Sequence, residues 1–199
     1  GINFIDTSND YGKSEEMIGR FISHRRSEYF LATKCGCPSI GGEHIWTREN
    51  LFRGLHESLE RLKTDYVDVM QLHNATVEDV DQGGLIDVLE EMRDQGKVKW
   101  IGSSSVSPSI ETFISRGDFD QYQIPYSAMD RRHEKVIADA SASDAGTVIR
   151  GGVQQGEPGT DSRGKVEQWN PFFTASLDDL RDTGESRTGF LLRYTMAHP

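Results

Sequence analysis

The sequence has few cysteines, no long apolar run and a deficit of positive charge, and each absence excludes a class of protein. Its only thiols are Cys35 and Cys37, too few for the disulfide framework of a small secreted domain, and they indicate a cytoplasmic location. No apolar run approaches the roughly 18 residues of a membrane span. The 22 basic and 32 acidic residues give a formal charge of −10, which argues against nucleic acid as a partner.

A metal site is not expected either. The C-x-C spacing of Cys35 and Cys37 can hold a metal, but four soft ligands do not gather near it in the sequence. A metal hydrolase built on Asp6 and His73 would need a second histidine at ligand spacing, and none is evident. We therefore interpret both thiols as structural.

Short apolar runs alternate with segments of helical spacing. The runs are β-branched or aromatic and often apolar at consecutive positions, which is typical of strands buried on both faces. They are residues 2–5, 29–33, 66–72, 98–103, 122–124 and 147–150. Two intervening segments repeat apolar residues at the spacing of one helix face, namely Leu51, Leu55, Leu59 and Leu62, and then Leu85, Leu89 and Met92.

Further signals mark helix ends. Ser14, followed by Glu15 and Glu16, indicates a helix start with acids at the positive end of the helix dipole. Gly96 is expected to close one helix, and Pro108 to open another. Residues 151–171 form the longest segment without periodicity, and a loop of that length is usually functional.

The order of these elements predicts an α/β protein with a parallel sheet and right-handed crossovers. A doubly wound sheet and a (β/α)8 TIM barrel both fit the pattern. The lack of a G-x-G-x-x-G motif after a strand weakens the doubly wound, dinucleotide-binding version. No shift in composition marks a boundary, so residues 1–199 are predicted to form a single domain.

Four predicted strands are each followed by a side chain able to do chemistry. These residues are Asp6, Lys34, His73 and Ser104. In a parallel barrel the carboxyl ends of all strands lie on one face, so these side chains would meet at one mouth. Each residue by itself could have a purely structural role, for example as a turn residue for Asp6 or a solvated strand end for Lys34. Their equivalent positions favour a shared site.

Tyr11 lies shortly after Asp6, on the loop over the same mouth. Tyrosine is by itself a weak acid at neutral pH, but a nearby ammonium favours its phenolate. Lys34 is the available ammonium, and Asp6 would hold it by an ion pair. Tyr11 would then donate a proton to a developing alkoxide while His73 orients the carbonyl. General acid catalysis of this kind is worth about 10²–10⁴ in rate.

These residues resemble the aldo-keto reductase family. The resemblance rests on Gly1-Ile2-Asn3-Phe4-Ile5-Asp6-Thr7 with Tyr11-Gly12-Lys13-Ser14-Glu15, on Ala32-Thr33-Lys34, on Asp65-Tyr66-Val67-Asp68 with Leu72-His73, and on Val98-Lys99-Trp100-Ile101-Gly102. It implies hydride transfer from a nicotinamide, usually NADPH, to an aldehyde or ketone. By this resemblance Tyr11 is the proton donor, Lys34 and Asp6 tune it, and His73 positions the substrate.

The resemblance also implies part of a cofactor-binding site. Ser104 matches the family's serine after the fifth strand, and Ser105 stands where the family has asparagine. Gln123 matches the glutamine that holds the nicotinamide carboxamide. Trp46 stands where an aromatic side chain can line the substrate pocket or pack at its rim.

The end of the seventh strand departs from the family's pattern. Where the family often stacks an aromatic ring on the nicotinamide, this sequence has Arg150, whose planar guanidinium can stack but adds charge. Gly151, Gly152 and Val153 then begin the loop expected to cover the pyrophosphate.

The length is a second departure. In the family's count residues 2–5 are the second barrel strand, 147–150 the seventh and 187–197 the helix after it. The first strand and the eighth βα unit are then missing, and 199 residues fall short of the about 250 of a full barrel. We therefore expect an incomplete barrel, truncated at both ends, whose open edges favour self-association and whose activity is impaired.

Two other functions stay open. Lys34 can be the Schiff-base lysine of a barrel aldolase, but such a lysine needs a lowered pKa, and Asp6 close by would stabilise its ammonium. A non-catalytic regulatory or binding barrel related to the family is the second, and the intact set of four residues argues against it. The pattern does not identify the substrate.

Overall fold

The chain forms two compact units, Gly1–Tyr122 and Gln123–Pro199. The structure, a computed structural model, describes residues 1–38, 41–159 and 161–198. Residues 35–46 and 151–171 are thus described apart from positions 39, 40 and 160. The expectation of a single domain stays a prediction.

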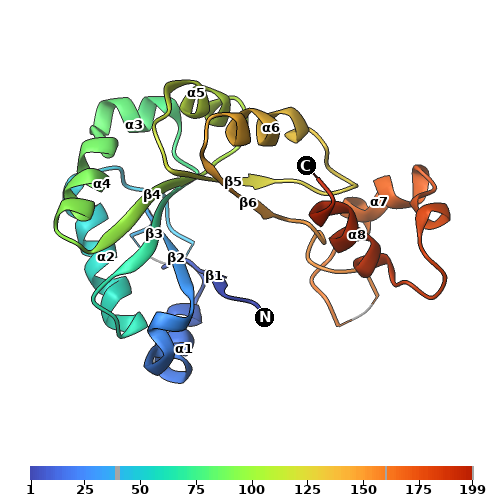
Figure 1. The fold of residues 1–199 in the computed structure, drawn as a ribbon, viewed down its shortest axis with the longest axis horizontal. Coiled ribbons are helices and arrows are strands. Elements are labelled where there is room, and N and C mark those ends of the chain that lie inside the picture. Colours follow the sequence, from blue (N-terminus) through green and yellow to red (C-terminus); the bar gives the residue numbers. More distant parts are fainter. Residues whose placement is uncertain (39–40, 160, 199) are drawn as a thin grey trace. The chain divides into compact units, whose positions relative to one another are not determined.

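Strands and helices alternate along the first unit (Figure 1). Its elements are β1 (Phe4–Asp6), α1 (Ser14–Phe21), the 3-10 helix η1 (Ser23–Glu28), β2 (Phe30–Cys35), α2 (Arg48–Leu62), β3 (Val67–His73), α3 (Val77–Gly83), α4 (Leu85–Asp94), β4 (Val98–Ser104) and α5 (Ser109–Arg116). Strand β5 (Gln121–Pro125) begins in this unit and continues into the second. Each strand pairs in parallel with the next, β1 with β2, β2 with β3 and β3 with β4.

The second unit continues the alternation. It holds α6 (Glu134–Ala142), β6 (Gly146–Arg150), α7 (Val166–Thr174), the 3-10 helix η2 (Leu177–Leu180) and α8 (Arg187–Met196). The hydrogen-bonded order of the described strands follows the chain from β1 to β6. Parallel strands in chain order, with helices between them, are the topology of an incomplete (β/α)8 barrel, as the sequence predicts.

Apolar burial in the first unit follows the predicted pattern. All of β3 is buried, and so are Leu51, Leu55 and Leu62 on α2. On α4 the residues Leu85, Leu89 and Met92 are buried as well, and Figure 1 shows α2, α3 and α4 on the outer side of the strands. Each fully buried side chain of this size contributes about 1.5–3 kcal/mol relative to exposure.

Four strands are less buried than predicted. In β1 Phe4 and Ile5 are only partly buried, because β1 pairs with β2 alone among the described strands. Exposed residues also occur at the start of β2, at two positions of β4 and at the start of β6, namely Phe30, Lys99, Trp100, Gly146 and Thr147. The expectation of burial on both faces is therefore wrong for parts of these strands and right for β3.

Glu15 lies in the first turn of α1, as predicted, and is buried there. Its side chain is buried, accepts a 2.6 Å hydrogen bond from the Thr33 hydroxyl and lies 2.7 Å from Arg61 Nε. It thereby joins α1 to β2 and α2. Helix α1 does begin at Ser14, as predicted, but no side chain caps it; the Ser14 hydroxyl accepts instead from Thr7 Oγ1 at 2.7 Å.

The predicted loop of residues 151–171 ends earlier than expected, because α7 begins at Val166. Trp169 and Phe172 on α7 pack with Phe190 and Leu191 of α8 into the buried apolar cluster of the second unit. Burial of these large side chains outweighs the helix-breaking tendency of Pro171, which lies inside α7. Helix α8 forms where it was expected.

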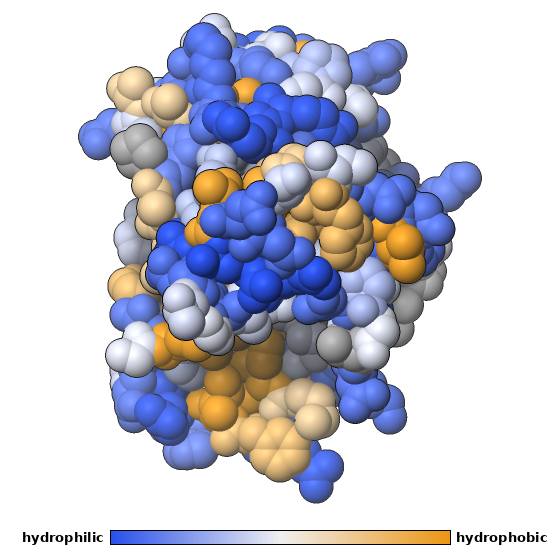
Figure 2. Space-filling model, turned by 90° about the vertical axis from the view of Figure 1, so that its right-hand side faces the viewer, coloured by the Kyte–Doolittle hydropathy of each residue, from blue (hydrophilic) through white to orange (hydrophobic). Residues whose placement is uncertain are grey.

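Large apolar side chains also reach the surface. In the second unit they are Val166, Phe173, Leu180, Leu192 and Met196. On the face drawn in Figure 2, apolar areas lie among a larger polar surface. Among the described residues, no helix combines the length and apolarity needed to cross a membrane.

A buried carboxylate at the start of β3 links four segments of the first unit. Asp68 is 2.6 Å from Arg26 and 2.8 Å from Lys99, and it accepts a 2.8 Å hydrogen bond from the Leu31 N–H. Arg26 and Lys99 both lie over the Tyr66 ring, at 4.2 Å and 4.3 Å from its centroid. Burial raises the pKa of Asp68, but the hydrogen bonds from Lys99, Arg26 and Leu31 outweigh it, so its pKa lies below the ordinary value.

Asp68→Ala is expected to lower the free energy of unfolding by about 3–5 kcal/mol, because it leaves the Arg26 guanidinium and the Leu31 N–H without their buried acceptor. Urea unfolding followed by circular dichroism at pH 7 measures the loss. Because the folded pKa is depressed, the stabilisation is present above the ordinary carboxyl pKa and disappears as the pH falls through the folded value. The gap between wild type and variant should therefore narrow in acid.

The exposed Glu60 on α2 provides the matched control. Glu60→Ala should change the free energy of unfolding by no more than about 0.5 kcal/mol. Equal effects of the two substitutions would contradict the structural role assigned to Asp68.

Candidate active site

A buried ammonium group lies at the carboxyl end of β2. The Lys34 side chain is fully buried, and its Nζ donates to Asp6 Oδ2 at 2.7 Å and to the Thr7 carbonyl at 2.8 Å. Lys34 is part of β2 and Asp6 of β1, so each strand extends slightly further than predicted. The two ends are held side by side by parallel pairing, which continues as the Thr7 N–H donates to the Ala32 carbonyl.

Gln71 completes this network and was missed by the sequence analysis. Its Nε2 donates to Asp6 Oδ1 at 2.8 Å, so the two carboxylate oxygens of Asp6 bind different partners. Gln71 lies opposite Lys34 in the β2–β3 register and is buried. The sequence did contain one indication of this role. Gln71 precedes His73 by two residues, and this spacing places both side chains on the same face of β3.

Tyr11 lies over the buried ammonium. Lys34 Nζ is 4.7 Å from the centroid of the Tyr11 ring, a cation–π distance. The Tyr11 ring meets the His73 ring edge to face, with centroids 5.9 Å apart. Tyr11 is 46% exposed whereas Lys34 is 1% exposed, so the phenol faces solvent and the ammonium does not. The four predicted residues therefore converge; their catalytic roles stay predictions.

A second histidine approaches the same place, against the expectation that none does. Cys37 Sγ is 3.1 Å from His44 Nε2 and 3.7 Å from His73 Nδ1. The rings of His44 and His73 meet at 5.5 Å in a T-shaped arrangement. Spacing along the chain did not reveal this cluster, because His44 reaches it only through the fold of the loop after β2.

Hydrogen bonds to backbone carbonyls hold the loop between β2 and α2. The Ile45 N–H donates to the Gly36 carbonyl at 2.9 Å, which joins the two arms that carry Cys37 and His44. Asn50, near the start of α2, donates through Nδ2 to the carbonyls of Gly36 and Ile45 at 3.0 Å and 2.7 Å. One buried amide thus fixes both arms.

Trp46 supports His44 from the side. Its ring stacks on the His44 ring with centroids 5.2 Å apart and an interplanar angle of 5°. Gly36 has φ +115°, and a Cβ at this position would lie 2.5 Å from the Trp46 ring. Trp46 is partly buried, and its predicted position, lining the substrate pocket or packing at its rim, stays a prediction.

Neither cysteine forms a disulfide. Burial raises the pKa of Cys35 to about 12. Burial, together with the Asp10 carboxylate, raises the pKa of Cys37 to about 11. Because the thiolate is the reactive form, both thiols are weak nucleophiles near neutral pH.

The expected nicotinamide residues of the first unit lie beside β3. Ser104 ends β4 opposite His73, and its carbonyl accepts from the Asn74 N–H at 2.8 Å. Ser105 is buried; its hydroxyl lies 2.8 Å from the Ser103 hydroxyl and donates to the Ala75 carbonyl at 3.3 Å.

The remaining expected cofactor residues belong to the second unit. Gln123 is buried on β5, and Arg150 ends β6, where its carbonyl accepts from the Tyr126 N–H at 3.1 Å. The following loop does begin as a turn, because Gly151 has φ +74° and its carbonyl accepts from the Gln154 N–H at 3.0 Å. A Cβ on Gly152 would lie 3.4 Å from Thr195 Oγ1, and Val153 packs against the apolar cluster of this unit.

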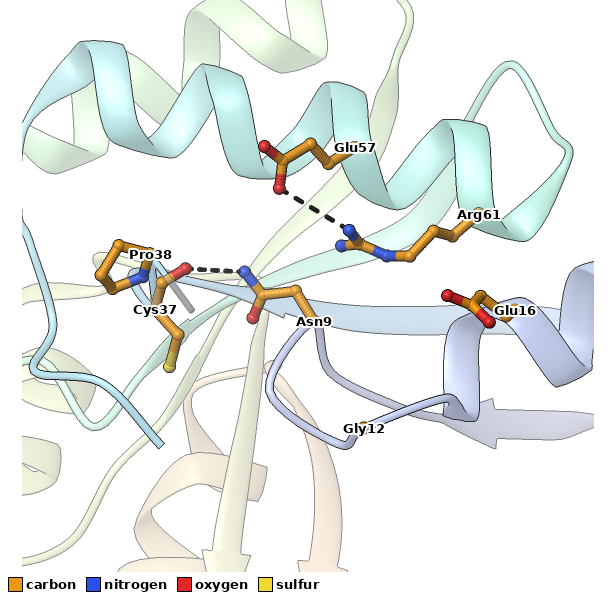
Figure 3. A pocket seen from close by; sticks show the side chains of 7 residues that line it. All are labelled: Asn9, Gly12, Glu16, Cys37, Pro38, Glu57 and Arg61. Atoms are coloured by element: carbon orange, nitrogen blue, oxygen red, sulfur yellow. Dashed lines mark hydrogen bonds and ion pairs between the residues drawn. The ribbon is translucent and has the colours of Figure 1, made fainter. Parts of the chain in front are cut away.

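A cavity of about 190 Å³, separate from the four converging residues, is lined in part by Cys37 and Pro38 (Figure 3). Glu16, Glu57 and Arg61 line it, and Arg61 forms an ion pair with Glu57 at 3.6 Å. The Asn9 side chain closes one wall by donating to the Cys37 carbonyl at 3.0 Å. In Figure 3 the Cys37 thiol points away from the Glu57–Arg61 pair. None of the four converging residues lines this cavity.

Comparison with known proteins gives consistent matches. The model of the Aldo/keto reductase family matches residues 1–160. The uncharacterized oxidoreductase YqkF of Bacillus subtilis (strain 168) is 30% identical over 219 aligned residues, which cover 100% of this chain and 71% of YqkF. L-galactose dehydrogenase of Arabidopsis thaliana is 36% identical over 121 residues, which cover 57% of this chain and 37% of that enzyme.

Solved structures agree with this result. The aldo-keto reductase AKR11C1 from Bacillus halodurans, in its holo form, matches with a TM-score of 0.82 and 27% identity. The match covers 100% of this chain and 70% of that one, which confirms the incomplete (β/α)8 barrel. The chain spans between 37% and 71% of the lengths of these three proteins.

Gly36→Ala is expected to destabilise the protein by about 1–3 kcal/mol, because the new Cβ both strains the backbone and collides with the Trp46 ring. Gly117→Ala is the matched control, since Gly117 also has positive φ, of +70°, but open space around its Cβ position. Urea unfolding of both variants compares the combined cost of strain and collision at Gly36 with that of a Cβ added at positive φ in open space. A Gly36→Ala loss no larger than that of Gly117→Ala would show that the Trp46 ring yields to the added Cβ without cost.

Proposed function

The chain belongs to the aldo/keto reductase family, and from that premise we propose that it reduces the carbonyl group of an aldehyde or ketone to an alcohol with NADPH. One observation carries the proposal: the Lys34 ammonium is held by Asp6 and the Thr7 carbonyl beneath the Tyr11 ring, with His73 beside that ring. This arrangement couples an accessible acid to a buried positive charge.

The residues present fit a nicotinamide cofactor. A carboxamide needs both hydrogen-bond donors and acceptors, and in the first unit the hydroxyls of the buried Ser104 and Ser105 can act as either. In the second unit the buried Gln123 carries a side-chain amide that can also do both. Gly151 and Gly152 leave backbone free of side chains at the start of the loop that would receive the pyrophosphate. When bound, a reduced nicotinamide supplies the hydride. Arg150 would lie where the family often stacks an aromatic ring.

The protein's own side chains handle the proton. As negative charge develops on the substrate oxygen, the Tyr11 hydroxyl donates its proton to that oxygen. The Lys34 ammonium stabilises the phenolate that remains, because it lies 4.7 Å from the centroid of the ring and is itself buried. His73, at the edge of the same ring, orients the carbonyl toward Tyr11.

Asp6 and Gln71 act by positioning. Asp6 binds Lys34 through one carboxylate oxygen and Gln71 through the other, so neither side chain can turn away without losing a hydrogen bond. The same contacts disfavour Schiff-base chemistry at Lys34. An iminium nitrogen carries a single N–H and could keep only one of the two contacts that Nζ makes to oxygen acceptors within 2.8 Å. A cytoplasmic location, favoured by the two free thiols, belongs to this proposal.

Tyr11→Phe is expected to lower kcat for carbonyl reduction by about 10²–10⁴-fold, because it removes the proton donor and leaves the ring in place. NADPH oxidation at 340 nm with a panel of aldehydes and ketones measures the rate. Tyr29→Phe, which changes a tyrosine of the same unit outside the site, should retain the wild-type rate. Equal rates for Tyr11→Phe and the wild type would refute Tyr11 as the acid, and a wild type without activity toward any carbonyl would contradict the proposed reaction.

NADPH is expected to support a higher kcat/KM than NADH with the same carbonyl substrate. Steady-state rates measured with each cofactor at several concentrations decide between them. A preference for NADH would contradict the proposed cofactor while leaving the role of Tyr11 intact, so the two parts of the proposal are separately testable.

A further inference from the structure

We propose that Cys37, His44 and His73 form a binding site for Zn²⁺ at the carboxyl ends of β2 and β3. One ligand atom from each residue lies within 4.8 Å of the other two. Cys37 and His44 lie in the loop between β2 and α2, and His73 ends β3.

Both separations from the sulfur suit a tetrahedral zinc ion. With Zn–S of about 2.3 Å and Zn–N of about 2.0–2.1 Å, tetrahedral angles place a sulfur and a nitrogen ligand about 3.6 Å apart. The observed separations from Cys37 Sγ are 3.1 Å to His44 Nε2 and 3.7 Å to His73 Nδ1. The two histidine nitrogens lie within 4.8 Å of each other, against about 3.3 Å around a tetrahedral ion, so the imidazole rings would close by up to about 1.5 Å as the ion binds.

The donor set selects the metal. One thiolate and two imidazoles suit zinc, while Mg²⁺ and Ca²⁺ take oxygen ligands. Three protein ligands leave a fourth tetrahedral position for water, as in open zinc sites. On binding, the Cys37 thiol releases its proton to solvent, and its sulfur binds the ion as the thiolate.

The cradle is already assembled without the ion. The Ile45–Gly36 hydrogen bond and the two bonds from Asn50 hold the arms that carry Cys37 and His44. The stacked Trp46 ring fixes the plane of the His44 ring. Because these contacts order the ligands in advance, little conformational entropy remains to be lost when the ion binds.

The zinc site does not depend on the proposed reductase activity, since the ligands can bind zinc whether or not the chain reduces carbonyls. His73 is the one residue common to both. Cys37 is buried and His44 is partly exposed, so an ion approaches from the side of His44.

Titration with Co²⁺, a spectroscopic substitute for zinc, tests the site directly. The chelator-treated full chain should bind one equivalent, with visible bands of a tetrahedral ion and a near-ultraviolet sulfur-to-cobalt charge-transfer band. Zn²⁺ should displace it, and a hundredfold excess of Mg²⁺ should not. X-ray absorption of the zinc-loaded wild type should show one sulfur at about 2.3 Å together with nitrogen or oxygen neighbours at about 2.0–2.1 Å.

Substitution of the ligands gives the second test. Cys37→Ala and His44→Ala should each weaken Zn²⁺ binding, measured by calorimetry, by at least about 100-fold. Loss of a group that only hydrogen-bonds to a metal ligand weakens binding by up to about 100-fold, and loss of a ligand itself should cost at least as much. Cys35→Ala and His56→Ala, which remove a thiol and an imidazole outside the cluster, should bind as the wild type does. Circular dichroism establishes that each variant is folded.

Three results would overturn the proposal. They are absence of Zn²⁺ binding by the wild type, cobalt bound without a sulfur charge-transfer band, and binding that folded Cys37→Ala and His44→Ala variants retain. If these variants do not fold, X-ray absorption of the wild type decides alone, because a spectrum without a sulfur neighbour excludes Cys37 as a ligand.

Discussion

The buried Lys34 ammonium is the constraint on which the candidate site depends. A charge with no exposed side-chain surface is tolerated only if its hydrogen-bonding groups find partners, because removing an ion from water costs several kcal/mol. Asp6 and the Thr7 carbonyl provide those partners, and Gln71 holds Asp6 from the next strand but one. The ends of β1, β2 and β3 are thereby tied together. Tyr11, half exposed above the ammonium, is the part of this network that a substrate reaches.

The two ends of the strands carry different kinds of polar network. At the start of β3, Asp68 binds Arg26, Lys99 and the Leu31 amide, and none of these groups lies near the converging residues at the other end of the strand. At the end of β3, His73 lies among chemically active side chains. This division, with stability at the amino ends and chemistry at the carboxyl ends, is general in parallel α/β barrels.

The mouth of the first unit thus holds two groups of side chains that meet at His73. On one side are Tyr11 and the buried ammonium; on the other are Cys37 and His44. The first group suits proton transfer to an oxygen, and the second suits a borderline-soft cation. A histidine placed between them can serve either chemistry, since a neutral imidazole has one nitrogen that donates and one that accepts.

The positions of the strands and main helices follow from the sequence alone, and so does the location of Asp6, Lys34 and His73 at the ends of neighbouring strands. Those features depend on periodicity and local backbone preference, which a short window of residues already contains. Four other features became visible only in the folded chain: the burial of Glu15, the hydrogen bond from Gln71 to Asp6, the start of α7 at Val166 and the approach of His44 to Cys37. Each of these depends on contacts between segments distant in the chain, because a polar side chain is buried only where another element supplies its hydrogen-bond partner. Local sequence patterns therefore predict the strands, the helices and the residues at the strand ends. The hydrogen-bond partners that orient those residues can be identified only in the folded chain.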